Sequence, residues 1–240
     1  MDWFSEWFDS PYYHILYKNR DLKEAELFID KLTAYLNLPA QARIIDIPCG
    51  KGRHCIYLNK KGFHVSGADL SPENIHYAQQ FSNDHLDFFI HDMRDEFAHN
   101  KFDAVLNIFT SFGYFEDPAD DQRCIHAFAK ALKPGGKLVI DFMNLTKVLQ
   151  ELVTEESKTV DGVNFLVRKK VVEGRIVKDI LFSDQGHAYH FQEKVTVLYK
   201  EDFLKYFTFA GLKIKSIFGD YQLNAFDPEN SDRLILIAEK

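Results

Sequence analysis

Short apolar runs alternate with helix-like segments in the first part of the chain. The runs predicted to be strands are 42–47, His64–Asp69, Leu86–Ile90, Phe102–Asn107 and 137–141. The segments predicted to be helices are those after Asp21, over 53–61, after Ser71 and over 120–132. Strands that alternate with helices in this way form a parallel sheet covered on both faces.

The pattern changes after residue 150, where segments become longer and alternate apolar with charged positions. Turn residues separate these segments at 173–174 and 184–186. We therefore expect an antiparallel β-sheet inserted at 155–199. A helix over 200–210 and strands at 212–218 and Arg233–Glu239 are expected to follow. The whole pattern predicts an α/β fold in a single domain over residues 1–240.

Charge and cysteine content narrow the class of protein. The chain has 240 residues, 36 acidic and 29 basic, for a net charge of −7, which disfavours a duplex nucleic-acid partner because such binders carry a basic face. The 3 cysteines fit neither a disulfide framework nor a zinc site and favour a reducing cytoplasm. The start, Met1-Asp2-Trp3, carries no basic residue, and no uncharged apolar run approaches ~18 residues, so we expect neither signal peptide nor membrane span.

A glycine-rich turn joins the first predicted strand to its helix. The strand ends near Asp46, and the turn Pro48-Cys49-Gly50-Lys51-Gly52 comes next. Such a turn lets a ligand approach the backbone closely. It is not a dinucleotide fingerprint, because Cys55 replaces the last glycine and because Asp46 would repel a pyrophosphate, whereas it suits an ammonium group. An ordinary tight turn is the alternative interpretation.

Two further acidic residues come after the second and third strands. Asp69 lies near the offset of ~20 residues at which an acid meets ribose hydroxyls. Asp92 is placed to accept a hydrogen bond from an adenine amino group, and Met93 supplies an apolar face. Each acid also has a local alternative, at a helix N-terminus for Asp69 and in a solvated loop for Asp92. With Asp46 they mark the carboxyl edge of the sheet, where open α/β sheets bind ligands.

These features resemble the class I S-adenosylmethionine-dependent methyltransferases over most of the chain. The motifs that carry the resemblance are Asp46-x-Pro48-Cys49-Gly50-x-Gly52-Arg53-His54, Asp69-Leu70-Ser71, Asp92-Met93, Phe102-Asp103-Ala104-Val105 and Leu132-Lys133-Pro134-Gly135-Gly136-Lys137-Leu138. The resemblance implies a Rossmann-like, doubly wound seven-stranded sheet with its last strand antiparallel, and S-adenosyl-L-methionine as cofactor. One departure is Pro48, which stands at the family's usual first glycine and removes a backbone donor; in this the chain is similar to a subgroup with Pro-Cys-Gly loops.

The resemblance also implies which residues hold the cofactor. They are Arg20, Asp46, Pro48, Cys49, Gly50, Gly52, Asp69, Leu70, Asp92, Met93 and Asn107. Asp46 and the glycine-rich turn would lie near the methionyl end, Asp69 at the ribose and Asp92 at the adenine. Asn107, at the end of the fourth strand, would face the methyl donor. Residues 1–40 resemble a helical lid, in which an arginine such as Arg20 reaches the methionyl carboxylate.

Aromatic residues make up 15% of the chain and gather at the N-terminus, after the fourth strand and in the insertion. Methyl transfer from a sulfonium needs alignment, exclusion of water and a deprotonated nucleophile. Tyr13, Tyr114 and His190 carry polar groups in these places and are the candidate catalytic residues. Core packing for the tyrosines and a surface position for His190 are the alternatives.

The segment after the fourth strand, 107–115, lacks the Asn-Pro-Pro-Tyr pattern of base methyltransferases. We therefore expect a small-molecule N or O acceptor, methylated by direct displacement without a metal. The pocket would be closed by the N-terminus and the insertion, and the insertion is also a candidate homodimer contact. Three alternatives stay open: a non-catalytic S-adenosylmethionine-binding protein of regulation or assembly, an RNA or protein methyltransferase, and a nicotinamide dehydrogenase.

Overall fold

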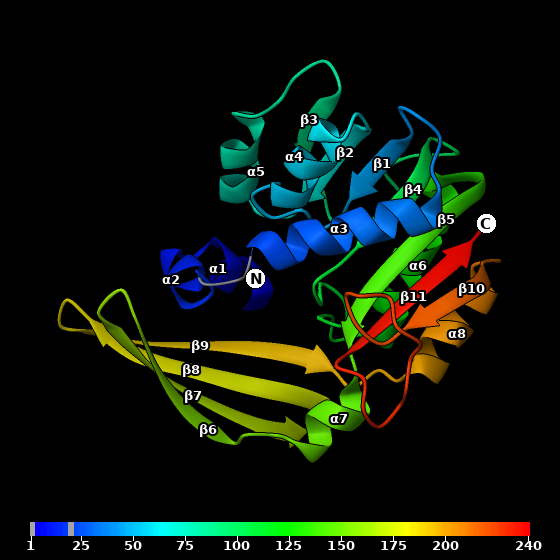
Figure 1. The fold of residues 1–240 in the computed structure, drawn as a ribbon. Coiled ribbons are helices and arrows are strands. Elements are labelled where there is room, and N and C mark those ends of the chain that lie inside the picture. The colour runs from blue at the N-terminus through cyan, green and yellow to red at the C-terminus, as the bar shows by residue number, and fades with distance from the viewer. Residues whose placement is uncertain (1–2, 19–21) are drawn as a thin grey trace.

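The computed structural model describes residues 3–18 and 22–240, which form two sheets with helices around them (Figure 1). The larger sheet has the order β10-β11-β5-β4-β1-β2-β3. Its strands are β1 (Arg43–Asp46), β2 (His64–Asp69), β3 (Leu86–Ile90), β4 (Phe102–Asn107), β5 (Leu132–Met143), β10 (Lys213–Phe218) and β11 (Arg233–Glu239). Strands β1 to β5 are parallel, and β11 is antiparallel to both of its neighbours. The predicted seven-stranded α/β sheet with an antiparallel last strand is confirmed.

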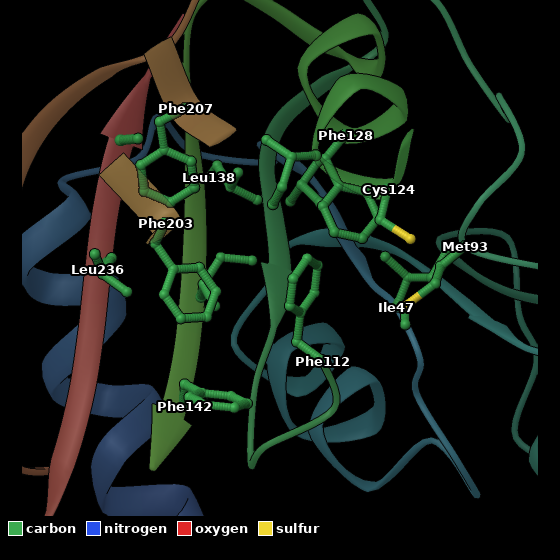
Figure 2. Close-up of a cluster of buried hydrophobic side chains, with 14 of the residues drawn as sticks. Ile47, Met93, Phe112, Cys124, Phe128, Leu138, Phe142, Phe203, Phe207 and Leu236 are labelled. Carbon is green, nitrogen blue, oxygen red and sulfur yellow. The ribbon is translucent and has the colours of Figure 1, made fainter. Parts of the chain in front are cut away.

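Helices cover both faces of the larger sheet. One face carries α3 (Leu22–Leu36), α4 (Arg53–Lys60) and α5 (Pro72–Gln79), and the other carries α6 (Pro118–Ala131) and α8 (Lys200–Phe209). Successive strand residues point to opposite faces, so Ile44 packs with the first set of helices and Ile45 with the second. Figure 2 shows the second core, in which Phe128 of α6 and Phe203 of α8 pack around Leu138 of β5. No helix in the described ranges is long and apolar enough to cross a bilayer.

The insertion forms a separate four-stranded antiparallel sheet, reached through the short helix α7 (Leu145–Gln150). Its strands, in order across the sheet, are β6 (Glu155–Val160), β7 (Val163–Val172), β8 (Arg175–Asp184) and β9 (His187–Thr196). The hydrophobic pattern does not distinguish β6, because it is an edge strand with mostly exposed, polar side chains. Strand β6 forms because its residues pair with those of β7.

Two short helices, α1 (Trp3–Asp9) and α2 (Pro11–Leu16), form where the sequence reads as irregular and aromatic. Ser10 caps α2 by accepting a hydrogen bond from the Tyr12 N–H at 3.2 Å, and Pro11 occupies the first helical position. Helices this short are not stable alone, so they form because they pack against the rest of the protein. The Trp7 ring lies 4.7 Å from Phe191 of β9, within a cluster that joins both helices to the second sheet.

Helix α6 buries an acidic side chain in the core beneath the segment that leaves β4. Asp121 is 1% exposed, and its Oδ1 has no hydrogen-bond partner among the described residues. Burial raises the pKa of Asp121 to about 7, and the negative charge of Asp120 adds to this, against a hydrogen bond from the Gly113 N–H and the charge of Arg175. Ionising this carboxyl therefore costs folding free energy.

Trp7→Ala tests whether the N-terminal helices are a packed part of the fold. Trp7 is fully buried and its Nε1–H donates to Glu193 Oε1 at 2.7 Å. The truncation should lower the free energy of unfolding in urea by about 3–5 kcal/mol, because a large cavity opens. The control Phe209→Ala, at a side chain 72% exposed, should change it by no more than about 0.5 kcal/mol. Equal stability of the two variants would contradict this packing.

Asp121→Asn tests the cost of the buried acid. Asp121 binds its proton more tightly in the folded state, so it contributes stability below its unfolded pKa of about 4 that is lost as the pH rises to about 7. Asparagine does not titrate. The free energy of unfolding in urea should therefore rise in the variant relative to the wild type as the pH goes from about 4 to about 8. The expected difference is on the order of a few kcal/mol. Parallel pH profiles of the two proteins would show that Asp121 ionises normally.

Candidate functional site

The parallel strands bring the predicted acids to one edge of the larger sheet. Asp46 ends β1, Asp69 ends the neighbouring β2, and Asp92 comes after β3 on the far side of β2. Asn107 ends β4, the other neighbour of β1. The carboxyl edge of β3, β2, β1 and β4 is thus lined by polar groups that are far apart in sequence.

Asp69 connects the glycine-rich turn to helix α5. Its carboxylate accepts hydrogen bonds from the Gly50 N–H at 2.8 Å and the Ser71 N–H at 2.9 Å. Burial raises its pKa, although both of these N–H groups favour the ionised form. Leu70, the next residue, packs against the core on the α6 side. The site therefore presents a rigid, buried carboxylate with remaining acceptor capacity.

The glycine-rich turn is shaped by close packing on one side and open space on the other. A Cβ added to Gly52 would lie 2.6 Å from the Phe88 ring, and one added to Gly67 would lie 2.5 Å from it. A Cβ added to Gly50 would meet no described atom within 4 Å. The Cys49 N–H donates to the Ala68 carbonyl at 2.8 Å, and the Ile47–Pro48 peptide is cis. The turn is therefore held against β2 while Gly50 leaves room for a ligand.

Two buried oxygen atoms at this edge lack hydrogen-bond partners among the described residues. They are Oδ1 of Asp46 and Oδ1 of Asn107. The other oxygen of Asp46 lies 3.4 Å from His54 Nδ1, and the Asn107 amide donates to the Ile47 carbonyl at 2.8 Å. Buried polar atoms are rarely left unpaired in native proteins. These two acceptors suit a ligand that brings an ammonium group or hydroxyls to the edge.

Asp92 is held by Arg94. The guanidinium donates from Nη2 to Asp92 Oδ2 at 2.6 Å and also reaches Asp120 at 3.3 Å. Partial burial opposes ionisation of Asp92, but the hydrogen bonds from Arg94 outweigh it and lower the pKa. Met93 is buried beside Asn107, with its sulfur 3.7 Å from the Asn107 amide nitrogen. Asp92 therefore stays an anion with a fixed orientation.

Helices α1 and α2 lie over this edge. Ser71 donates a hydrogen bond to Asp9 of α1, and Trp3 Nε1–H donates to the Tyr114 carbonyl at 3.3 Å. His14 of α2 is partly buried, and burial together with the positive charge of Lys51 in the glycine-rich turn lowers its pKa. Contacts from α1 thus reach the start of α5 and the segment after β4, and His14 of α2 lies within electrostatic range of the turn.

The structure brings two of the three candidate catalytic side chains together. The Phe8 ring lies 5.0 Å from Tyr13 and 5.5 Å from Tyr114. His190 lies elsewhere: it is 53% exposed and pairs with Asp179 at 2.9 Å. Because its neighbour Phe191 points to the N-terminal helices, His190 faces the opposite side of the second sheet. Arg20 lies outside the described residues.

Glu193 of β9 is a residue that the hydrophobic pattern does not single out. Its carboxylate accepts hydrogen bonds from Trp7 at 2.7 Å, from the Tyr17 hydroxyl at 2.6 Å and from Lys178 at 3.2 Å. Burial lowers the pKa of Lys178, and Glu193 opposes this. The partners from the N-terminal helices are far away in sequence, so no local spacing signals the cluster. It anchors α1 and α2 to the second sheet.

The described residues contain no group of three or more His, Cys, Asp or Glu side chains placed to hold a metal ion. The polar groups of the edge instead suit an organic ligand with an ammonium group, sugar hydroxyls and a base. S-adenosylmethionine carries all three, and the unpartnered oxygens of Asp46 and Asn107 and the open side of Gly50 fit it.

The known proteins that this chain resembles are methyltransferases. Residues 44–136 match the model of a methyltransferase domain. A dTDP-3-amino-3,4,6-trideoxy-alpha-D-glucopyranose N,N-dimethyltransferase of Streptomyces venezuelae is 27% identical over 192 residues, which cover 75% of this chain and 79% of the relative.

Two solved structures share the fold over nearly the whole chain. An S-adenosylmethionine-dependent methyltransferase of Clostridium acetobutylicum superposes with a TM-score of 0.80 at 21% identity, covering 95% of each chain. CalS10, an amino pentose methyltransferase of Micromonospora echinaspora solved with S-adenosylmethionine bound, superposes with a TM-score of 0.71 at 21% identity, covering 96% of this chain and 97% of that one. The matched methyltransferase domain contains the glycine-rich turn and the strand-end acids, and the chain has the fold of S-adenosylmethionine-dependent methyltransferases.

Proposed function

We propose that the protein methylates the amino group of a small, sugar-like molecule. The observation that carries this is the extent of similarity to amino-sugar N,N-dimethyltransferases. Those of Streptomyces venezuelae and Streptomyces fradiae align over 192 and 188 residues, far beyond the matched domain at 44–136. Ubiquinone biosynthesis O-methyltransferases align over only 123 residues, 49% of this chain. The longer alignments favour an amine acceptor over a hydroxyl.

The carboxyl edge of the larger sheet supplies the cofactor site in this proposal. Asp69 would accept hydrogen bonds from the ribose hydroxyls, and Asp92 with Met93 would hold the adenine. The unpartnered Oδ1 of Asp46 and the open side of Gly50 suit the methionyl end. The bound cofactor supplies an electrophilic methyl group on a sulfonium. The chain supplies orientation and exclusion of water.

Aromatic residues of α1, of α2 and of the segment after β4 suit the acceptor. Phe8, Tyr13 and Tyr114 form a continuous wall that can keep water from the reacting amine. The Tyr114 hydroxyl donates to the Thr110 carbonyl, and this bond fixes the orientation of the phenol ring in the wall. A neutral amine already has its nucleophilic lone pair, so the tyrosines orient it. His190, on the outer face of the second sheet, takes no part in this arrangement.

Methyl transfer is tested with S-adenosylmethionine and dTDP-3-amino-3,4,6-trideoxy-α-D-glucopyranose, read by mass spectrometry. We expect S-adenosylhomocysteine and products that carry one and two added methyl groups. The matched control acceptor is dTDP-4,6-dideoxy-α-D-glucose, which has a hydroxyl in place of the amino group at the same carbon and should stay unmodified. Methylation of a hydroxyl acceptor alone would refute the amine proposal, and cofactor binding without turnover on any amine would favour a regulatory role.

Asp69→Asn tests the cofactor site. The change keeps the shape of the side chain but removes charge-assisted hydrogen bonding, which is worth about 1.5–3 kcal/mol. The Kd for S-adenosylhomocysteine, measured by calorimetry, should therefore rise about 10- to 100-fold. Asp84→Asn, at an exposed position before β3, is the matched control and should leave the Kd unchanged. Equal affinities of the two variants would remove Asp69 from the site.

A further inference from the structure

The turn that leaves β4 has an unusual backbone. Phe109 and Thr110, two consecutive residues other than glycine, have φ values of +61° and +58°. Left-handed backbone is disfavoured for residues with a Cβ, and more so for a β-branched residue such as threonine. Such conformations persist only where the surrounding structure enforces them, and they cluster at functional sites. The turn therefore requires neighbouring groups that hold it in this conformation.

Asp141 of β5 is the first of these groups. The Phe109 N–H donates to Asp141 Oδ2 at 2.8 Å, and the Thr110 N–H donates to the Asp141 carbonyl at 3.0 Å. Tyr221 adds a hydrogen bond from its hydroxyl to Asp141 Oδ2 at 3.2 Å. The carboxylate is fully buried. One residue thus captures both N–H groups of the strained turn.

Arg233, the first residue of β11, is another group that holds the turn. Its Nε–H donates to Asp141 Oδ1 at 2.8 Å, and its Nη2 donates to Thr110 Oγ1 at 2.8 Å. The guanidinium therefore binds the carboxylate that holds the turn and also a side chain of the turn itself. A planar fork with several donors can make these contacts together, whereas an ammonium group cannot reproduce the geometry.

The held turn connects to both halves of the proposed site. The Phe109 ring stacks on His54 at 4.7 Å and 6°, and His54 contacts Asp46, the acid at the end of β1. On the other side, the Thr110 carbonyl accepts the hydrogen bond of Tyr114 in the aromatic wall. A change in the turn would thus move a wall of the acceptor site relative to a cofactor residue.

We propose that Arg233 is a positioning residue for methyl transfer, which acts through Asp141 and Thr110 to hold the β4 turn in its left-handed conformation. This inference rests on the proposed function, because it concerns the alignment of acceptor and methyl donor. Misalignment lowers the rate of the chemical step without removing the groups that bind the cofactor. The signature of the role is therefore a loss in kcat at unchanged cofactor affinity.

Arg233→Lys is the principal test, with Arg168→Lys as its matched control. Arg168 pairs with Glu155 at 2.7 Å on the exposed face of the second sheet. With the amino-sugar nucleotide as acceptor, Arg233→Lys should lower kcat by about 10- to 100-fold, with a much smaller change in the acceptor KM. The Kd for S-adenosylhomocysteine should stay at the wild-type value. Arg168→Lys should match the wild type in each measurement.

Hydrogen exchange supplies a readout that does not depend on turnover. Amide exchange of Phe109 and Thr110 should accelerate in Arg233→Lys, while amides of α6 and β2 keep their protection. A purely structural role would instead lower the thermal midpoint and speed exchange throughout the sheet. Thr110→Val removes only the hydroxyl that Arg233 binds and should reproduce the kcat loss, and Thr110→Ser, which keeps it, should restore most of the rate.

The outcomes separate this inference from the proposed function. Wild-type kcat and unchanged exchange in Arg233→Lys would overturn the positioning role. Absence of turnover in the wild type with every amine would count against the proposed function, and the exchange comparison would still judge whether Arg233 holds the turn. Global unfolding of Arg233→Lys together with full activity of Thr110→Val would also overturn the inference.

Discussion

The common direction of strands β1 to β5 is the constraint on which the rest of the structure depends. Parallel strands place all their carboxyl ends at one edge, so acids separated by long stretches of chain become neighbours there. Asp69 turns this placement into a rigid feature, because its carboxylate binds backbone N–H groups of the glycine-rich turn and of the next helix. The polar edge exists because the sheet aligns the strands and because buried hydrogen bonds fix the turns at their carboxyl ends.

The aromatic N-terminus contacts both sheets. Trp7 and Tyr17 bind Glu193 in the second sheet, while Trp3 and Phe8 pack against Tyr114 beside the larger one. The apolar contacts supply the packing, and the partly buried carboxylate of Glu193 fixes the orientation. A cover built in this way is part of the folded core, and its inner surface is also a wall of the proposed acceptor site.

Local pattern is enough to locate most strands and helices. The bounds of β2, β3 and β4 agree with their short apolar runs, and Ser71 and Pro72 mark the start of α5. Strand β5 is longer than its apolar run: it begins at Leu132, which pairs with Phe102 of β4, and it includes 134–136, where the register of that pairing shifts. Helices α1 and α2 and strand β6 escape prediction because their own residues do not stabilise them; tertiary contacts do.

By itself the sequence determined the α/β class, the inserted sheet and the acids that end the parallel strands, because these depend on periodicity and on residues adjacent in the chain. Only the tertiary structure decided which polar groups meet. His190 lies apart from the tyrosines because successive side chains of a strand point to opposite faces of the sheet. Asp141 of β5 meets Arg233 of β11 because the two strands are neighbours in the sheet. Contacts between segments that are distant in the chain produce no local sequence pattern. The hydrogen bonds of Asp141 and Arg233 behind the β4 turn could therefore be found only in the tertiary structure.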